Sequence, residues 1–274
     1  MPSGKASRAR RGPSQQARVP APPRAGPSER RQASPRVLLG VGAGILVAAV
    51  AVVLAIVLGG GSSGVGNVPA RGSLNGALPG AAAVQRLFRG VPQNANILGG
   101  STAPVTLVEY VDLQCPYCRE FEATVFPTLV ARYVRRGKLR VDQRLLAFIG
   151  PDSARGRSAA IAAGEQGKQF NYTELLYFNQ GTENTGWLDE KMVAAAGASI
   201  PGLHVPELLA ASKSGPVADQ ATVFDDEAKA GGIDSTPTLL VGRTGGTLHA
   251  VAMTSPTDAE SVAAAIDAAL AGSS

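Results

Sequence analysis

The chain has 274 residues, of which 45% are hydrophobic and 17% charged, and its formal net charge is +5. Nine basic residues and one acidic residue lie in residues 1–36, so the rest of the chain carries 17 basic and 20 acidic residues. Because this remainder is mildly acidic, the composition argues against a basic nucleic-acid-binding surface on it, and we expect no nucleic-acid partner.

Residues 1–36 are rich in Pro, Ser, Gly and Arg, and they have too little apolar content to fold, so we predict a disordered basic tail. The next 22 residues, Val37–Leu58, contain no charged side chain and are long enough for a single transmembrane helix. A cleaved secretory signal is the alternative, but its apolar stretch normally spans about 7 to 15 residues behind a short basic head. The positive-inside rule places the tail in the cytoplasm. We therefore expect a single-pass cell-membrane protein whose folded part is extracytoplasmic.

The part after the apolar segment divides into a linker and one domain. Residues 59–80 are mostly Gly, Ser and Asn with scattered apolar residues, which predicts a flexible linker. Residues 81–274 are numerous enough for one domain with a hydrophobic core. Its first predicted helix covers 81–89. Val105–Leu113 has apolar residues on both faces, which predicts a central strand covered from both sides.

Elements of alternating type follow this strand. The tetrapeptide Cys-Pro-Tyr-Cys comes directly after it, and an amphipathic helix is then predicted up to Arg136, with a kink at Pro127. Residues 138–148 form a second predicted strand. An Ala-rich helical insertion is predicted at about 150–230, with helices at 153–166, 169–179, 188–197, 205–212 and 216–230.

The chain ends with a predicted hairpin and helix. Strands are predicted at 238–241 and 248–253, around the turn-forming residues 242–246. The sequence Thr257-Asp258-Ala259-Glu260 fits a capping box that opens a last helix. The order of elements predicts an α/β fold around a small mixed sheet.

The cysteines of the tetrapeptide, Cys115 and Cys118, are the only two in the chain. Where a strand is followed by a helix, the first sulfur lies beside the unpaired N–H groups of the helix, which stabilise a thiolate. Cys115 is therefore the predicted nucleophile. Pro116 suits the first helical turn. Cys118, one turn later, is placed to close a disulfide or to resolve a mixed disulfide.

A metal site, a structural disulfide and a protease nucleophile are less well supported roles for the cysteine pair. A structural zinc site needs two more ligands and requires both histidines, His204 and His249, so we expect no metal. A purely structural disulfide would close a very small loop and stabilise little. A cysteine protease that uses Cys115 and one histidine has no supporting motif.

Three segments together resemble the DsbA-like thiol:disulfide oxidoreductases of bacterial envelopes, over about residues 90–272. They are VEYVDLQCPYCREFE at 108–122, AAGEQGKQF at 162–170 and GGIDSTPTLLVG at 231–242. Cys-Pro-Tyr-Cys is also the glutaredoxin signature, but the predicted export, the length and the helical insertion argue against that branch. The resemblance implies a thioredoxin fold with an inserted helical domain, preceded here by the transmembrane helix.

The resemblance also implies roles for residues outside the cysteine pair. Thr236-Pro237 would be a cis peptide bond beside the cysteines, where Thr236 offers backbone groups to an extended substrate. Glu109, six residues before Cys115, would be a buried carboxylate that assists proton transfer at Cys118, with its pKa raised by burial; the alternative is a strand residue that reaches solvent. Pro116 and Tyr117 would modulate the redox properties.

The expected function is thiol:disulfide exchange with exported proteins, as an oxidase that introduces disulfides through Cys115 and Cys118. No metal or soluble cofactor is expected. The resemblance implies reoxidation by a membrane partner of the DsbB or vitamin K epoxide reductase kind. Two alternatives remain open: an extracytoplasmic reductase or isomerase, for example in cytochrome c maturation, and a non-catalytic binding module or chaperone that uses the groove beside Pro237.

Overall fold

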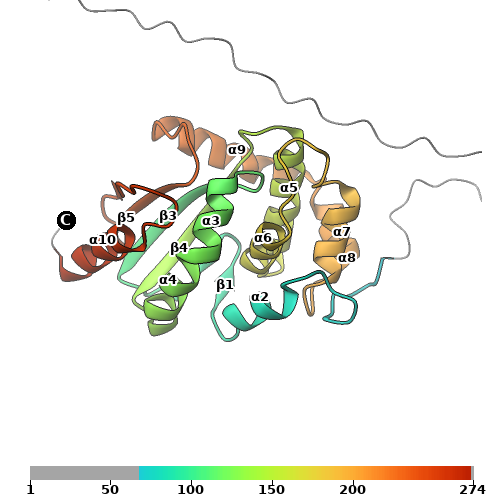
Figure 1. Cartoon of the computed structure of the whole chain (residues 1–274), viewed down its shortest axis with the longest axis horizontal. Coiled ribbons are helices and arrows are strands. Elements are labelled where there is room, and N and C mark those ends of the chain that lie inside the picture. The colour runs from blue at the N-terminus through green and yellow to red at the C-terminus, as the bar shows by residue number, and fades with distance from the viewer. Residues whose placement is uncertain (1–67, 273–274) are drawn as a thin grey trace, which may run out of the picture. The chain divides into compact units, whose positions relative to one another are not determined.

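The computed structural model describes residues 68–272 (Figure 1). The predicted basic tail (1–36), the predicted transmembrane helix (37–58) and residues 59–67 of the predicted linker lie outside the described residues. Among residues 68–272, no helix combines the length and the apolar composition needed to cross a bilayer.

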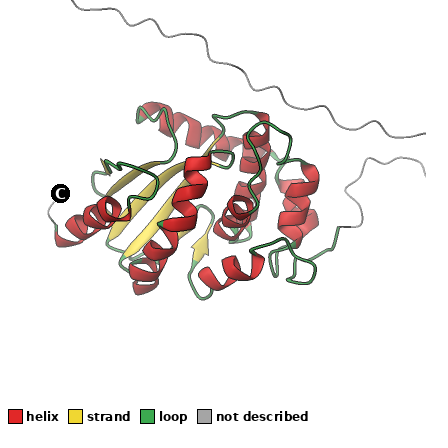
Figure 2. Cartoon of the chain, viewed as in Figure 1, coloured by secondary structure: helices red, strands yellow, loops and turns green. Residues whose placement is uncertain are grey.

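A mixed sheet of six strands lies at the centre of the fold, in the order β1-β2-β4-β3-β5-β6 (Figure 2). β3 pairs in parallel with β4 and antiparallel with β5. All eight residues of β3 are buried, as the apolar residues on both of its faces predicted. The bounds are β1 Gln93–Asn94, β2 Ile97–Leu98, β3 Val105–Asp112, β4 Leu139–Leu146, β5 Thr238–Arg243 and β6 His249–Ala250.

Helices cover both faces of this sheet. Leu107 of β3 shares a hydrophobic cluster with Ile266 of α10. The next residue of β3, Val108, shares the other cluster with Phe224 of α9. Because consecutive strand residues point to opposite faces, α9 and α10 lie on opposite sides of the sheet. The helices outside the insertion are α2 Ala81–Leu87, α3 Pro116–Thr124, α4 Phe126–Arg132, the 3₁₀ helix η1 Val134–Arg136 and α10 Ala259–Ala271.

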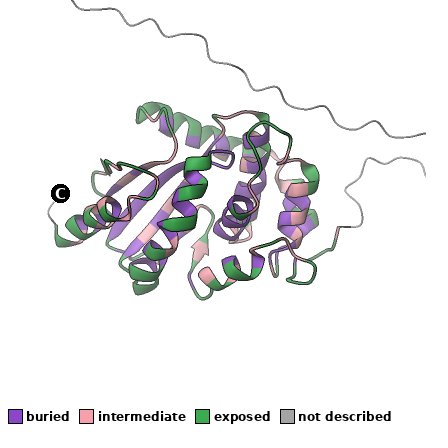
Figure 3. Ribbon diagram, in the orientation of Figure 1, coloured by how far each residue is buried: buried purple, intermediate pink, exposed green. Residues whose placement is uncertain are grey.

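The helical insertion lies between β4 and β5, as predicted. Its cluster includes both cysteines and the last residues of β3, so the insertion completes the core around the start of α3. α5 and α6 are the most buried of its helices, whereas α9 exposes one face (Figure 3). The helices are α5 Pro151–Glu165, α6 Gln169–Phe178, α7 Glu190–Ala198, α8 Val205–Ala211 and α9 Gly215–Ala230.

Three predictions need correction at element ends. The strand predicted at 248–253 is much shorter, since β6 covers only His249–Ala250. The N-cap of α10 is Asp258 and not Thr257, because the Asp258 carboxylate accepts a hydrogen bond from the Ser261 N–H at 3.0 Å. The predicted kink at Pro127 is a full break, since α3 ends and α4 begins around Val125. Pro127 sits in the first turn of α4, where its missing N–H leaves no helical hydrogen bond unmade.

The folded domain also begins before residue 81, the predicted end of the linker. Gly72 N–H donates to the carbonyl oxygen of Leu203 at 2.8 Å, and Ser73 N–H donates to that of Ala198 at 2.9 Å. These bonds fix the segment against the insertion. The short hairpin of β1 and β2 was not predicted, because strands of two residues show no periodicity.

Candidate active site

Cys115 and Cys118 lie where β3 passes into α3. β3 ends at Asp112, a short turn follows, and α3 begins at Pro116. Pro116 occupies the first helical turn, as predicted, and Cys115 is the N-cap of the helix. The strand-to-helix junction thus holds the first sulfur at the positive end of α3.

The Cys115 sulfur has two polar contacts. It accepts a hydrogen bond from the Cys118 N–H at 3.5 Å, and its thiol reaches the carbonyl oxygen of Thr236 at 3.3 Å. The pKa of Cys115 falls from 9.0 to about 6, chiefly because the Cys118 side chain forms a hydrogen bond with the sulfur. At neutral pH the reduced protein therefore presents Cys115 as a thiolate, the form that exchanges with disulfides.

Cys118 has the opposite environment. Its side chain is 0% exposed, and burial raises its pKa well above 9.0, with the Cys115 hydrogen bond adding to the rise. Both cysteines are free thiols in this structure. The pair therefore combines a stabilised thiolate with a buried thiol, and the assignment of nucleophile and resolving thiol stays a prediction.

The loop before β5 completes the site. The Thr236-Pro237 peptide bond is cis, as the resemblance implied. Pro237 is half-buried, and Thr238 pairs with Tyr110 at the end of β3 that leads to the cysteines. This pairing brings Thr236 to Cys115 although 121 positions separate them in the chain.

Glu109 is fully buried, so the alternative that it reaches solvent is wrong. Its Oε1 accepts a hydrogen bond from Gln143 at 2.8 Å, whereas Oε2 has no partner. Burial raises the pKa of Glu109 well above 4.5, and the nearby Glu122 adds to the rise. Burial therefore favours the neutral acid form of Glu109, which can give a proton, but no hydrogen bond joins it to Cys118 among the contacts of residues 68–272.

Two further buried acids were not predicted. Glu122 on α3 is fully buried and neither of its oxygens has a hydrogen-bond partner. Together with Glu174 of α6 it lines a cavity of about 560 Å³ at the surface between α2, α4 and α6. Burial raises the pKa of Glu122, with Glu174 adding to the rise, and burial raises that of Glu174 to about 7. Helical spacing could have indicated Glu122, since it lies one turn after Cys118 on the same helix face.

Tyr117, between the two cysteines, is the most exposed large hydrophobic side chain near the site, at 60%. No set of three His, Cys, Asp or Glu residues within 68–272 is arranged to hold a metal ion. Of the two histidines, His204 precedes α8 and His249 lies on β6.

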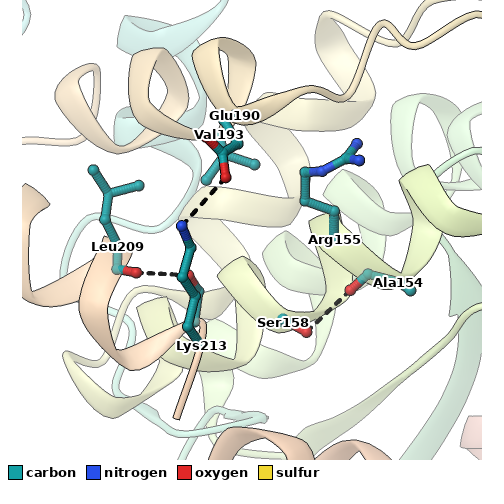
Figure 4. A pocket seen from close by; sticks show the side chains of 8 residues that line it. Ala154, Arg155, Ser158, Glu190, Val193, Leu209 and Lys213 are labelled. Atoms are coloured by element: carbon teal, nitrogen blue, oxygen red, sulfur yellow. Dashed lines mark hydrogen bonds and ion pairs between the residues drawn. The ribbon is translucent and has the colours of Figure 1, made fainter. Parts of the chain in front are cut away.

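A separate cavity of about 340 Å³ lies within the helical insertion, between α5, α7 and α8 (Figure 4). Its charged groups are already paired, since Lys213 Nζ lies 3.2 Å from Glu190 Oε1 and Arg155 binds Asp152 at 2.7 Å. None of the predicted site residues lines it. The candidate active site is therefore the cysteine pair with its cis-proline loop.

Comparisons with known proteins agree with this geometry. A protein-family model described as Thioredoxin matches residues 93–268. The probable disulfide bond formation protein D of Bacillus cereus is 28% identical over 147 residues, which cover 53% of this chain and 68% of that protein. Disulfide bond formation protein D of Bacillus subtilis is 26% identical over 150 residues, covering 53% and 66%.

Solved structures show the same fold. The oxidised form of BdbD from Bacillus subtilis superposes with a TM-score of 0.58 at 21% identity, covering 66% of this chain and 98% of that one. Alpha-DsbA1 from Wolbachia pipientis gives a TM-score of 0.56 at 18% identity, covering 65% and 92%.

Proposed function

Since this chain belongs to the thioredoxin family and is a thiol:disulfide oxidoreductase with a DsbA-like fold, we propose that it works as a dithiol oxidase for exported proteins. The choice of oxidase over reductase rests on the acidity of Cys115. The surroundings of Cys115 lower its pKa to about 6, so they stabilise the thiolate of the reduced protein. A stabilised reduced form makes the oxidised form a stronger oxidant.

The reaction consists of two thiolate attacks. A substrate thiolate attacks Cys115 Sγ in the Cys115–Cys118 disulfide, and the S–S bond breaks with its electron pair leaving on Cys118, which takes up a proton. Glu109 is the proposed donor of that proton. A second substrate thiolate then attacks the substrate sulfur of the mixed disulfide, and Cys115 leaves as a thiolate. The substrate has lost two electrons and the enzyme has gained them.

The substrate is proposed to bind beside the cis-proline loop. The position of Thr236 next to Cys115 supports this, because an extended chain that lies along the loop would bring its own cysteine to the Cys115 sulfur. Tyr117 is an exposed aromatic surface for the apolar residues of such a chain. Pro116 and Tyr117 also remain the proposed modulators of the redox equilibrium.

Location and reoxidation belong to the same proposal. The apolar run Val37–Leu58 and the basic residues before it support a membrane anchor with the catalytic domain outside the cytoplasm. An oxidase must return its two electrons to an acceptor, and a membrane protein of the DsbB or vitamin K epoxide reductase kind is the proposed one. A reporter fused after Ser274 should be active only outside the cytoplasm, and activity inside would contradict this location.

The reduction potential of the Cys115–Cys118 pair tests the direction. We expect a value between the roughly −270 mV of thioredoxin and the roughly −120 mV of DsbA. Equilibration of the full chain with glutathione buffers, read by alkylation of free thiols, measures it. A value near that of thioredoxin would overturn the oxidase proposal in favour of a reductase. If Cys115→Ala keeps full activity in cells, the binding-module alternative holds instead.

A further inference from the structure

The turn that leads into Cys115 is bonded to the helical insertion through a buried carboxylate. Asp112, the last residue of β3, is fully buried. Its Oδ1 accepts hydrogen bonds from the Gln114 N–H at 2.8 Å and from the Ser153 hydroxyl at 2.6 Å. Its Oδ2 accepts one from the Ile149 N–H at 3.0 Å. Ser153 belongs to the first turn of α5, so this one carboxylate joins the active-site turn to the insertion.

The main chain of the same turn also forms hydrogen bonds to the helical insertion. The Tyr177 hydroxyl of α6 donates to the carbonyl oxygen of Asp112 at 3.2 Å. The Gln180 amide, just after α6, donates to the carbonyl oxygens of Leu113 at 2.8 Å and of Cys115 at 3.1 Å. Three main-chain carbonyl groups of the turn, up to and including that of Cys115, therefore accept hydrogen bonds from the insertion.

The side chain of Gln114 closes the network. Its amide nitrogen donates to the Ser153 hydroxyl at 3.0 Å, and its amide oxygen accepts from the Asn184 N–H at 2.8 Å. Ser153 thus contacts both Asp112 and Gln114. Every polar atom of the Asp112 and Gln114 side chains has a partner, as buried polar groups require.

We propose that Asp112 is a positioning residue for thiol exchange, which acts with Ser153 to hold the turn before Cys115 against the helical insertion. The Cys118 N–H on α3 donates to the Cys115 sulfur and is the contact that stabilises a thiolate. The carbonyl oxygen of Thr236 accepts from the protonated thiol and so fixes the position of the sulfur. Both contacts depend on where the turn places the N-cap of α3. A preorganised donor arrangement stabilises charge without rearrangement at the moment of reaction. The proposal rests on the exchange reaction and holds for either direction of electron flow.

Two variants of the full chain test this role. Asp112→Asn keeps the shape but turns one acceptor oxygen into a donor, so one of its three hydrogen bonds is lost. Ser153→Ala removes the hydroxyl that bridges Asp112 and Gln114 and leaves the charge of the carboxylate unchanged. The readouts are the pH midpoint of Cys115 alkylation in the reduced protein, the rate of mixed-disulfide formation with oxidised glutathione, and the melting temperature.

We expect Asp112→Asn to raise the pH midpoint by about one unit, which lowers the thiolate fraction about tenfold at pH values well below the midpoint, although replacing a nearby acidic group by a neutral amide by itself favours the thiolate. Ser153→Ala should shift it in the same direction by about half as much. The matched control is Asp142→Asn on β4, whose carboxylate also accepts two hydrogen bonds, from Asn96 at 2.6 Å and Arg144 at 3.1 Å, but away from the cysteines. This control should lower the melting temperature and leave the midpoint unchanged.

A merely structural role gives a different result. In that case Asp112→Asn and Ser153→Ala lower the melting temperature as the control does, with the alkylation midpoint and the exchange rate unaltered, and the proposal is overturned. If Asp112→Asn does not fold, Ser153→Ala decides alone, because loss of one hydroxyl in a first helical turn leaves the fold intact. If the native chain exchanges disulfides but its reduction potential is near that of thioredoxin, only the oxidase proposal is contradicted.

Discussion

The sulfurs of Cys115 and Cys118 are one helical turn apart and yet have opposite acidities. Cys115 caps α3 and receives hydrogen bonds, whereas Cys118 is enclosed by the core. The pKa of Cys115 is lower in the folded protein than in the unfolded one. Its contribution to the stability of the reduced form is therefore present at pH values above about 9 and is lost as the pH falls through about 6.

The substitution Cys118→Ala tests the cause of this acidity. The largest stabilisation of the Cys115 thiolate comes from the Cys118 side chain, so its removal should raise the pKa of Cys115 from about 6 by about one unit or more. Ultraviolet absorbance of the thiolate during a pH titration measures this. An unchanged midpoint would mean that the backbone N–H groups of α3 alone hold the charge.

Glu109→Gln tests the proposed proton transfer. Without an ionisable group at position 109 to exchange a proton with Cys118, attack of Cys118 on a mixed disulfide should slow by up to about a hundredfold, the lower range for general acid–base catalysis. The measurement is the release of glutathione from a Cys115–glutathione adduct. Glu120→Gln, an exposed change on α3, is the control and should leave the rate unaltered. Equal rates in all three proteins would remove Glu109 from the mechanism.

At the scale of elements, the helices and long strands were predictable because each combines a periodic apolar pattern with an end signal. α5 to α9 begin and end within about two residues of their predicted bounds. Three features could not be predicted, because tertiary contacts decide them: the β1–β2 hairpin, the break at Val125 and the folded segment between residue 68 and α2. In the same way the pairing of Cys115 with Cys118 followed from spacing, whereas Asp112 and Ser153 meet only through the fold.

The N-cap of α10 gives a prediction at this scale. The Asp258 carboxylate accepts from the N–H groups of Ser261 at 3.0 Å and Thr254 at 2.9 Å, and these bonds lower its pKa. Asp258→Ala should reduce the melting temperature by about 2 to 4 °C. The difference in melting temperature between Asp258→Ala and the native chain should vanish in strong acid, because Asp258 is protonated as the pH falls through its lowered pKa. The control is Asp267→Ala, also on α10, which removes an exposed ion pair with Arg132 of α4. It should change the melting temperature much less.

At the scale of the whole molecule, the insertion and the thioredoxin part share one core near the cysteines. Gly156 of α5 lies so close to this junction that an added Cβ would meet Leu188 and come within 2.9 Å of Leu113. Gly156→Ala should therefore destabilise the protein by roughly 1 to 3 kcal/mol through overpacking. Gly215→Ala, at the start of α9 with open space around it, should be neutral or slightly stabilising. Urea unfolding compares the two, and equal stabilities would mean that α5 shifts freely.

The long chain separation between Cys115 and Thr236 has a consequence for biosynthesis. A polypeptide that has been made only as far as the insertion already contains both cysteines, but it lacks β5 and the loop that contacts the first of them. Such a nascent chain has thiols without a finished site. The order of the segments along the chain therefore delays the contact between Cys115 and Thr236 until almost the entire domain has been translated.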